Sequence, residues 1–353
     1  MLSFWKLCVA GVAATLVSLG AMPAQAQTRV QGSGATFPAP LYAKWIETYN
    51  AAHADTKVDY QAIGSGGGIK GITFRTVAFA GSDAPMTADQ EKAAPAKILH
   101  LPMVAGPEVM IYNLPELTEK LKLDGATIAD IYLGKIKKWN DAKIAALNPG
   151  IALPSKPVVV VHRADGSGTT FIFTNYLSKV SKEWSEKVGN ATAVEWPLGL
   201  GGPGNKGVAS AVQSTVGAIG YVEFAFASKE KIPYATQINK DGKAVNASIE
   251  GVVASIAASV KEFPEDLKVG ITDAPGADSY PICGFTYLLV YEDLSYLKDK
   301  DLATKLVDYI KWCVTDGQET AKDLGYAKLP KEAQEKVLAK LKTIKFDGEA
   351  LLK

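Results

Sequence analysis

The sequence predicts an α/β protein with mostly parallel sheets, and three observations support that prediction. Apolar or alternating segments typical of strands take turns with segments of helical spacing from about residue 28 onward. Such alternation is typical of βα units, which pair their strands in parallel. The length of 353 residues indicates about two domains. No repeat or low-complexity linker divides them, so we expect the chain to cross between domains more than once.

The first part of the chain opens with an expected strand that ends near Gln31 and continues into a helix over 40–50. Pro38 and Pro40 suit the first turn of that helix, where a missing N–H does least harm. Further expected elements are an alternating strand at 57–64 with a glycine turn and a helix after it, a strand, polar turn and helix over 77–94, and a pair of strands over 99–113.

The second part of the chain continues the plan. We interpret the segment "GGPGNKGVAS" (201–210) as a turn before a helix that begins near Val208. The other expected elements are a helix and its exit over 122–140 and a strand, loop and helix over 156–180. The helix at Val208 is followed by a glycine turn, a strand and a further helix, which extend to residue 230. A strong strand at 280–292 and two helices over 301–330 come last.

The first 26 residues predict a secretory signal peptide. Lys6 is their only charged residue, a continuous apolar run follows it, and the small residues at 24–26 form a cleavage site. A membrane anchor is the alternative, but the run is short for a span and ends in that cleavage-like site. We therefore expect a soluble, exported protein whose mature chain begins near Gln27.

Composition and charge narrow the class of partner. Apolar residues make up 47% of the chain and charged residues 21%, which is typical of a globular protein. Without Lys6 the 38 basic residues become 37, equal to the 37 acidic ones. A neutral chain argues against nucleic acid or an anionic membrane as a partner. Two cysteines remain after the signal, Cys283 and Cys313, and either a disulfide or two buried thiols would suit an exported protein.

Four polar turns share one layout, in which each turn follows a strand and opens a helix. Helix N-termini present unpaired N–H groups, glycines let an anion approach the backbone, and hydroxyls add donors. Any one such turn is more often an ordinary capped connection, but four together favour an anion site at the carboxyl ends of the strands. They are "GSGATF" (32–37), "GSGGG" (64–68), "GSDAPMT" (81–87) and "RADGSGTT" (163–170).

The residues needed for catalysis are missing from these turns. A nucleophilic serine of the hydrolase type needs a glycine two residues before it. The residue at that position is Asp165 for Ser167 and Ile63 for Ser65. The chain has three histidines, none in a metal-ligand spacing, and no nucleotide-binding loop. We therefore expect no catalytic residue, no metal and no cofactor.

Two charged side chains in the turns point to the kind of anion. The guanidinium of Arg163 can meet a tetrahedral oxyanion with two hydrogen bonds, and Asp165 can hold it in place, although a plain loop ion pair is the alternative. Asp83 is an acid where an anion should bind, which makes sense if the ligand brings its own proton, as phosphate does and sulfate does not. The alternative is that Asp83 caps the following helix.

Several motifs together resemble the periplasmic phosphate-binding proteins of high-affinity phosphate ABC transporters, from about residue 30 to about 330. The resemblance implies a periplasmic-binding-protein fold, with two α/β lobes joined by two crossover strands and the ligand in the cleft. It implies lobes of 28–104 plus 277–353 and of 105–276. The motifs that carry it are "GSGATFPAPLYAKW", "YQAIGSGGG", "SDAPMT", "DIYLGKIKKWND", "RADGSGTTFIFTNYLSKV" and "GAIGYVEFAFA".

The resemblance also assigns roles to single residues. Asp83 would accept the phosphate proton, Arg163 would pair with the oxyanion, and Asp165 would hold Arg163. Gly66 stands where relatives often have a second serine, and His162 stands where a second arginine is common, so neither receives a role in binding. The implied phosphate-binding set is Thr36, Phe37, Ser65, Asp83, Arg163, Ser167, Gly168 and Thr169.

The expected function is that of a periplasmic, monomeric receptor that binds inorganic phosphate and delivers it to the membrane permease and ATPase of an ABC importer. A secreted phosphatase on the same fold is one alternative. A binder of another protonated oxyanion, such as arsenate, is the other.

Overall fold

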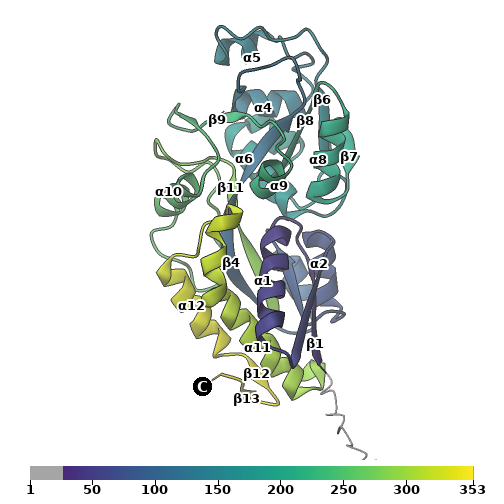
Figure 1. Cartoon of the computed structure of the whole chain (residues 1–353), viewed down its shortest axis with the longest axis vertical. Coiled ribbons are helices and arrows are strands. Elements are labelled where there is room, and N and C mark those ends of the chain that lie inside the picture. Colours follow the sequence, from purple (N-terminus) through teal and green to yellow (C-terminus); the bar gives the residue numbers. More distant parts are fainter. Residues whose placement is uncertain (1–26, 353) are drawn as a thin grey trace, which may run out of the picture.

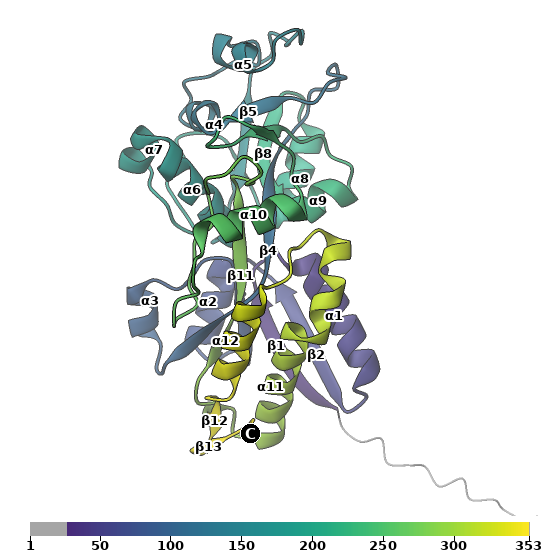
Figure 2. The ribbon, with the colours of Figure 1, turned by 90° about the vertical axis from the view of Figure 1, so that its left-hand side faces the viewer.

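Two strands, β4 (Ile98–Tyr112) and β11 (Cys283–Tyr291), join the two α/β lobes of the protein (Figures 1 and 2). The computed structural model describes residues 27–352, and the predicted signal peptide lies outside them. Both strands run from one lobe into the other, which confirms the predicted fold class.

The lower lobe in Figure 1 contains the N-terminal and C-terminal parts of the chain. Its strands and helices alternate as the sequence predicts, and Pro38 and Pro40 lie at the start of the first helix. The elements are β1 (Thr28–Gly34), α1 (Ala39–Ala52), β2 (Thr56–Ala62), α2 (Ser65–Thr73), β3 (Phe79–Ser82), α3 (Ala88–Ala93), α11 (Lys300–Val314), α12 (Lys331–Leu341), β12 (Lys345–Phe346) and β13 (Glu349–Ala350).

The upper lobe in Figure 1 is built from the middle of the chain. Its elements are β5 (Lys122–Asp124), α4 (Gly125–Tyr132), α5 (Ala142–Leu147), β6 (Val159–Arg163), α6 (Gly168–Val180), α7 (Lys182–Lys187), β7 (Leu200–Gly202), α8 (Gly204–Ser214), β8 (Ala218–Glu223), α9 (Phe224–Lys229), β9 (Thr236–Ile238), β10 (Ala244–Val245) and α10 (Ile249–Ser259).

One eight-stranded sheet runs through both lobes in the order β2-β1-β3-β11-β4-β8-β6-β7. Its two outer parts are parallel, as predicted, but the pairs β3·β11, β11·β4 and β4·β8 are antiparallel. The prediction of mostly parallel sheets is therefore wrong for the centre. The reason is that β4 leaves the lower lobe and β11 returns beside it, so the two strands must run in opposite directions.

Strand β4 corrects a second expectation, because 99–113 holds one strand rather than a pair. All 15 of its residues are buried, and its partner changes from β11 to β8 along its length. Pro102 does not break it, because the register with β11 shifts beside that residue. A bulge tolerates the missing N–H of proline.

Two further boundaries differ from expectation. The second of the two helices expected over 301–330 is replaced by 3₁₀ turns at Asp316–Thr320 and Lys322–Leu324. The Trp45 indole N–H donates to the carbonyl of Gly317 at 2.7 Å, which takes that carbonyl out of a continuous helix. Helix α8 begins at Gly204, four residues before the expected start at Val208.

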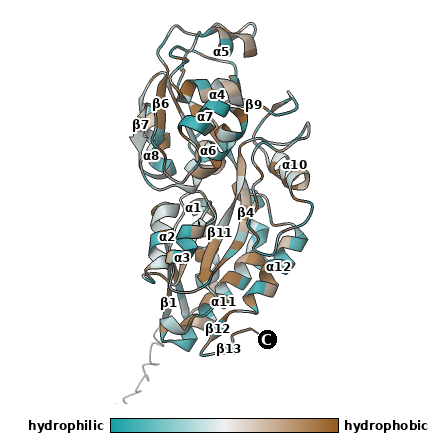
Figure 3. Cartoon of the chain, turned by 180° about the vertical axis from the view of Figure 1, so that it is seen from behind, coloured by the Kyte–Doolittle hydropathy of each residue, from teal (hydrophilic) through white to brown (hydrophobic). Residues whose placement is uncertain are grey.

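The core follows the central strands, which are among the most hydrophobic elements in Figure 3. Cys283 on β11 and Cys313 on α11 are both buried in it as free thiols, which decides the open question of their pairing. Within residues 27–352, no helix combines the length and the apolar character needed to cross a membrane.

Candidate functional site

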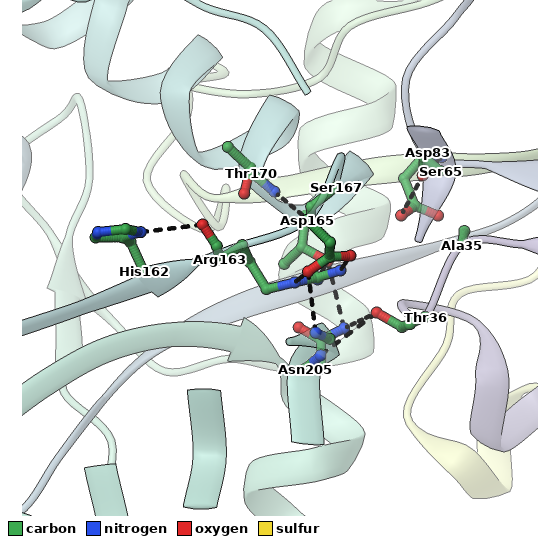
Figure 4. A network of polar contacts seen from close by, with 12 residues as sticks. Ala35, Thr36, Ser65, Asp83, His162, Arg163, Asp165, Ser167, Thr170 and Asn205 are labelled. Carbon is green, nitrogen blue, oxygen red and sulfur yellow. Dashed lines mark hydrogen bonds and ion pairs between the residues drawn. The ribbon is translucent and has the colours of Figure 1, made fainter. Parts of the chain in front are cut away.

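The four polar turns meet between the lobes, at the carboxyl ends of β1, β2, β3 and β6 (Figure 4). The Gly66 N–H of the lower lobe donates to the Gly166 carbonyl of the upper lobe at 2.8 Å. A Cβ added to Gly168 would overlap both Asp83 and Ser65. The turns are therefore in direct contact across the cleft. They lie at the carboxyl ends of strands, where open α/β folds bind their ligands.

Gly66 occupies one of the tightest points of this contact. A Cβ there would lie 2.9 Å from the Cα of Gly166, which is backbone and cannot rotate away. A serine at this position would require the two loops to shift. The glycine thus allows the turns of the two lobes to approach closely.

Arg163 is the buried cation of the site. Its Nε and Nη2 donate to the two carboxylate oxygens of Asp165 at 2.8 and 2.5 Å, and its Nη1 lies 3.3 Å from the hydroxyl of Thr169. The Arg163 side chain is only 1% exposed, against 25% for Asp165. Such a bidentate pair fixes the plane of the guanidinium, and its burial distinguishes it from an ordinary surface ion pair.

Asp165 is held from a second side as well. The Gly204 N–H, at the start of α8, donates to its Oδ1 at 3.0 Å. Burial alone would raise the pKa of Asp165, but the Arg163 charge and the Gly204 N–H outweigh burial and lower the pKa. Asp165 is therefore a carboxylate at neutral pH, with Arg163 charged beside it.

Asp83 faces the same space from the lower lobe. It is 3% exposed, its Oδ2 lies 3.4 Å from the Ser65 hydroxyl, and its Oδ1 is buried without a partner among the described residues. Burial raises the pKa of Asp83 to about 7, although the nearby Thr286 hydroxyl, Arg163 and Ser65 oppose the rise. The helix-cap alternative does not hold, because Thr87 caps α3 in a capping box with Gln90.

The helix starts supply donors around these charges. Ser167 caps α6, since its hydroxyl oxygen accepts from the Thr170 N–H at 3.0 Å. Its own N–H donates to the carbonyl of Thr192 at 2.7 Å, so only its hydroxyl hydrogen is left to donate. The N–H groups of Gly168 and Thr169 lie in the first turn of α6, where no intrahelical acceptor exists.

The structure also shows the contacts of Phe37, which was predicted to bind the anion, and of His162, which was not. Phe37 is fully buried, and its carbonyl accepts from the Tyr326 hydroxyl at 2.8 Å, which fixes the turn that presents its N–H. His162 stacks on Trp196 with ring centroids 4.7 Å apart. The ring points away from Asp165 and Asp83 in Figure 4.

Asn205 is a site residue that sequence reasoning missed. It lies in the first turn of α8, is fully buried, and its Nδ2 approaches the hydroxyls of Thr36 and Thr169 at 3.2 and 3.3 Å. A signal was present, because β7, a glycine turn and α8 repeat the layout of the other four turns. The segment was interpreted as a plain turn because its lysine and glycines lack the order of a nucleotide-binding loop.

Two buried glutamates beside the site were also missed. Glu108 on β4 pairs in register with Glu223 on β8, and both side chains are fully buried. Burial raises the pKa of both well above the usual value, and the negative charge of Asp83 adds to the rise. The two oxygens of Glu108 have no partner within the described part of the chain, whereas those of Glu223 accept from Ala225 N–H at 2.9 Å.

The fold and the site define a two-lobed binding protein with a buried polar centre between the lobes. A family model described as "PBP superfamily domain" matches residues 21–316. A phosphate-binding protein PstS of Pasteurella multocida is 44% identical over 331 residues, which cover 94% of each chain. A PstS of Xylella fastidiosa is 43% identical over 312 residues, covering 87% of this chain and 84% of that protein.

Solved structures agree on the fold. A phosphate-binding protein from Stenotrophomonas maltophilia has a TM-score of 0.68 at 18% identity and covers 89% of this chain and 94% of its own. The chain belongs to the PstS family of phosphate-binding proteins within the PBP superfamily.

Proposed function

We propose that the protein binds inorganic phosphate between its lobes and delivers it to the membrane permease and ATPase of an ABC-type phosphate importer. The observation that supports this most is Asp83, a buried carboxyl opposite a buried arginine, with one oxygen that has no partner among the described residues. An acceptor and a cation in one site suit an anion that carries a proton. The names of the relatives support the same ligand.

In this proposal the donors surround phosphate from both lobes. Thr36, Phe37 and Ser65 come from the lower lobe, and Asp165 keeps the guanidinium of Arg163 in its place. Asp83 accepts the P–OH hydrogen bond. The complete proposed phosphate-binding set is Thr36, Phe37, Ser65, Asp83, Arg163, Ser167, Gly168 and Thr169.

Selectivity against sulfate follows from the same acid. Sulfate has no proton to donate at neutral pH, so it would leave a buried carboxylate unpaired. An unsatisfied buried group costs roughly 1–3 kcal/mol, and more when it is charged. Sites built on such a hydrogen bond can discriminate by about 10⁴-fold.

The wider role follows from the family. We propose lobes of residues 28–104 plus 277–353 and of 105–276, which close on the ion about β4 and β11. We propose that the mature protein acts as a monomer in the periplasm after removal of residues 1–26. Its role is binding and transport, without an enzymatic activity of its own.

Calorimetry of the mature protein with phosphate and with sulfate tests this proposal. Phosphate should bind at about pH 8.5, and sulfate should bind at least about 30-fold more weakly, because Asp83 would have to take up a proton about 1.5 pH units above its pKa of about 7. Asp83→Asn should lose part of this selectivity. Equal binding of both ions by the wild type would overturn the role of Asp83, and no binding of phosphate would overturn the function itself.

The two alternatives can be separated from this proposal. Release of a chromogenic alcohol from a phosphate ester would indicate a secreted phosphatase, which the site geometry does not favour, because among the described residues no histidine or carboxylate forms a hydrogen bond with the Ser167 hydroxyl, which accepts from the Thr170 N–H. Arsenate carries a proton like phosphate, so the site should accept it. Competition between the two ions in the same calorimetry measures that preference.

A further inference from the structure

Asn205 connects the two lobes through hydroxyl groups of the site (Figure 4). It belongs to α8 in the upper lobe, yet its side chain reaches Thr36 at the end of the first turn of the lower lobe. Its second contact is the hydroxyl of Thr169 on α6. All three side chains are buried, so water does not replace these contacts in the closed protein.

The direction of these hydrogen bonds decides what the threonines can do. The amide Nδ2 can only donate, and the two threonine oxygens lie 3.2 and 3.3 Å from it. Arg163 Nη1, another obligate donor, also lies 3.3 Å from the Thr169 oxygen. The backbone N–H of Asn205 approaches the Thr36 oxygen at 3.4 Å.

Each threonine oxygen therefore faces donors that cannot accept in return. A hydroxyl can accept and donate, and one that accepts from its neighbours keeps its own hydrogen for another partner. An anion between the turns is such a partner. The arrangement turns two ambivalent hydroxyls into donors, one from each lobe.

We propose that Asn205 is a positioning residue that bridges the lobes on closure and orients the hydroxyls of Thr36 and Thr169 as hydrogen-bond donors to the bound anion. This inference rests on the proposed phosphate binding. The Thr36 contact can form only when the lobes are closed, so Asn205 stabilises the closed, loaded state rather than the fold of either lobe.

The test is a double-mutant cycle on phosphate binding. Asn205→Ala should raise the Kd by about ten- to a hundredfold, as expected for two lost hydrogen bonds. Stopped-flow kinetics should place most of the change in a faster dissociation rate. Thr36→Val should also weaken binding, and the loss in the double variant should be clearly smaller than the product of the two single losses, because the two changes share the Asn205–Thr36 contact.

Asn239→Ala is the matched control. Asn239 is another buried asparagine, and its Nδ2 donates to the carbonyls of Gly276, Ala277 and Ser279 in the loop that precedes β11. Its loss should lower the melting temperature of the ligand-free protein and leave the Kd for phosphate within about twofold. Asn205→Ala should show the reverse pattern, since its contact with Thr36 belongs to the closed state.

Each outcome has one meaning. A wild type that does not bind phosphate overturns the proposed function and this inference with it. A wild type that binds, with an Asn205→Ala variant of the same Kd or a fully additive cycle with Thr36→Val, overturns this inference alone. If Asn205→Ala does not fold, Asn205→Leu keeps the side-chain volume without polar atoms, and the same comparison applies to it.

Discussion

At the scale of single residues, Asp83 has a protonation state that changes near neutral pH. Burial raises its pKa to about 7 against the opposing effect of Arg163. Well above that pH the group is a carboxylate and can only accept a hydrogen bond. Below it the group is a carboxylic acid and can donate one. The choice between anions should therefore depend on pH.

We predict that sulfate binding strengthens as the pH falls. A protonated Asp83 can donate to sulfate, so sulfate affinity should drop roughly tenfold for each pH unit above about 7 and level off below it. Calorimetry with sulfate between about pH 5.5 and 8.5 measures this. The Asp83→Asn variant should show a flat profile over the same range, and a flat profile for the wild type would contradict the prediction.

A second prediction concerns Glu108, which is buried opposite Glu223 and has no hydrogen-bond partner within residues 27–352. Burial, with the charges of Asp83 and Glu223, raises the pKa of Glu108. The folded protein then keeps a proton that the unfolded chain releases above its ordinary carboxyl pKa. The free energy of unfolding therefore falls as the pH rises from that value toward the raised pKa.

Glu108→Gln should remove this loss. We expect the variant to be more stable than the wild type at about pH 8 by roughly 1–3 kcal/mol, with the difference shrinking toward about pH 4. Urea unfolding of the ligand-free protein measures it. Glu195→Gln, at an exposed position, is the control and should change little. A Glu108→Gln variant less stable at both pH values would argue for a required charge.

At the scale of elements, the start of α6 serves folding and binding together. Ser167 caps the helix, and Gly168 behind it leaves room for Asp83 and Ser65 of the other lobe. Gly168 has no positive φ, so alanine would suit the helix itself. The site requires glycine here because a side chain would collide with Asp83 and Ser65, and not because of the backbone conformation.

We predict that Gly168→Ala separates folding from binding. The stability of the ligand-free protein should stay equal or rise by up to about 1 kcal/mol, because alanine is the better helix former. Phosphate affinity should fall by at least about tenfold, because the methyl group pushes Asp83 and Ser65 away on closure. Gly270→Ala, whose Cβ would meet nothing within 4 Å, is the control for both measurements. Unchanged phosphate affinity in Gly168→Ala would contradict the close approach.

At the scale of the whole molecule, the lobes are held together by β4 and β11 and by the polar contacts of the site. The core that surrounds these strands is continuous, and both cysteines lie in it as free thiols. Cys283 Sγ lies 3.2 Å from the Tyr280 carbonyl, and burial raises its pKa to about 12. A thiol in such surroundings is a packing group with little thiolate character.

The mature protein should therefore contain two free thiols and no disulfide. Alkylating reagents should modify neither thiol in the native protein and both after denaturation, with the same mass pattern with and without reductant. Mass spectrometry of the alkylated samples measures this. A denatured sample that lacks both alkyl groups without reductant and gains them with reductant would show a Cys283–Cys313 bond.

Much of the site was predictable because short sequence motifs contain most of its residues. One turn contains Arg163, Asp165 and the glycines around them. The conformation of such a turn is determined largely by its own glycine and aspartate residues. Asn205 was not predictable in this way, because its partners Thr36 and Thr169 are far from it in the sequence. Glu108 was equally hidden, since its burial depends on which strands become its neighbours.

The sequence by itself determined the α/β alternation, the turns that expose helix N-termini, and the residues able to bind an anion. These depend on periodicity, glycine placement and side-chain chemistry, which act over a few residues. Only the tertiary structure decided that 99–113 is one crossover strand, that the centre of the sheet is antiparallel, and that Asp83 lies against Gly168. These depend on how distant segments pack, and burial then sets the pKa of Asp83, on which the proposed choice of ligand depends.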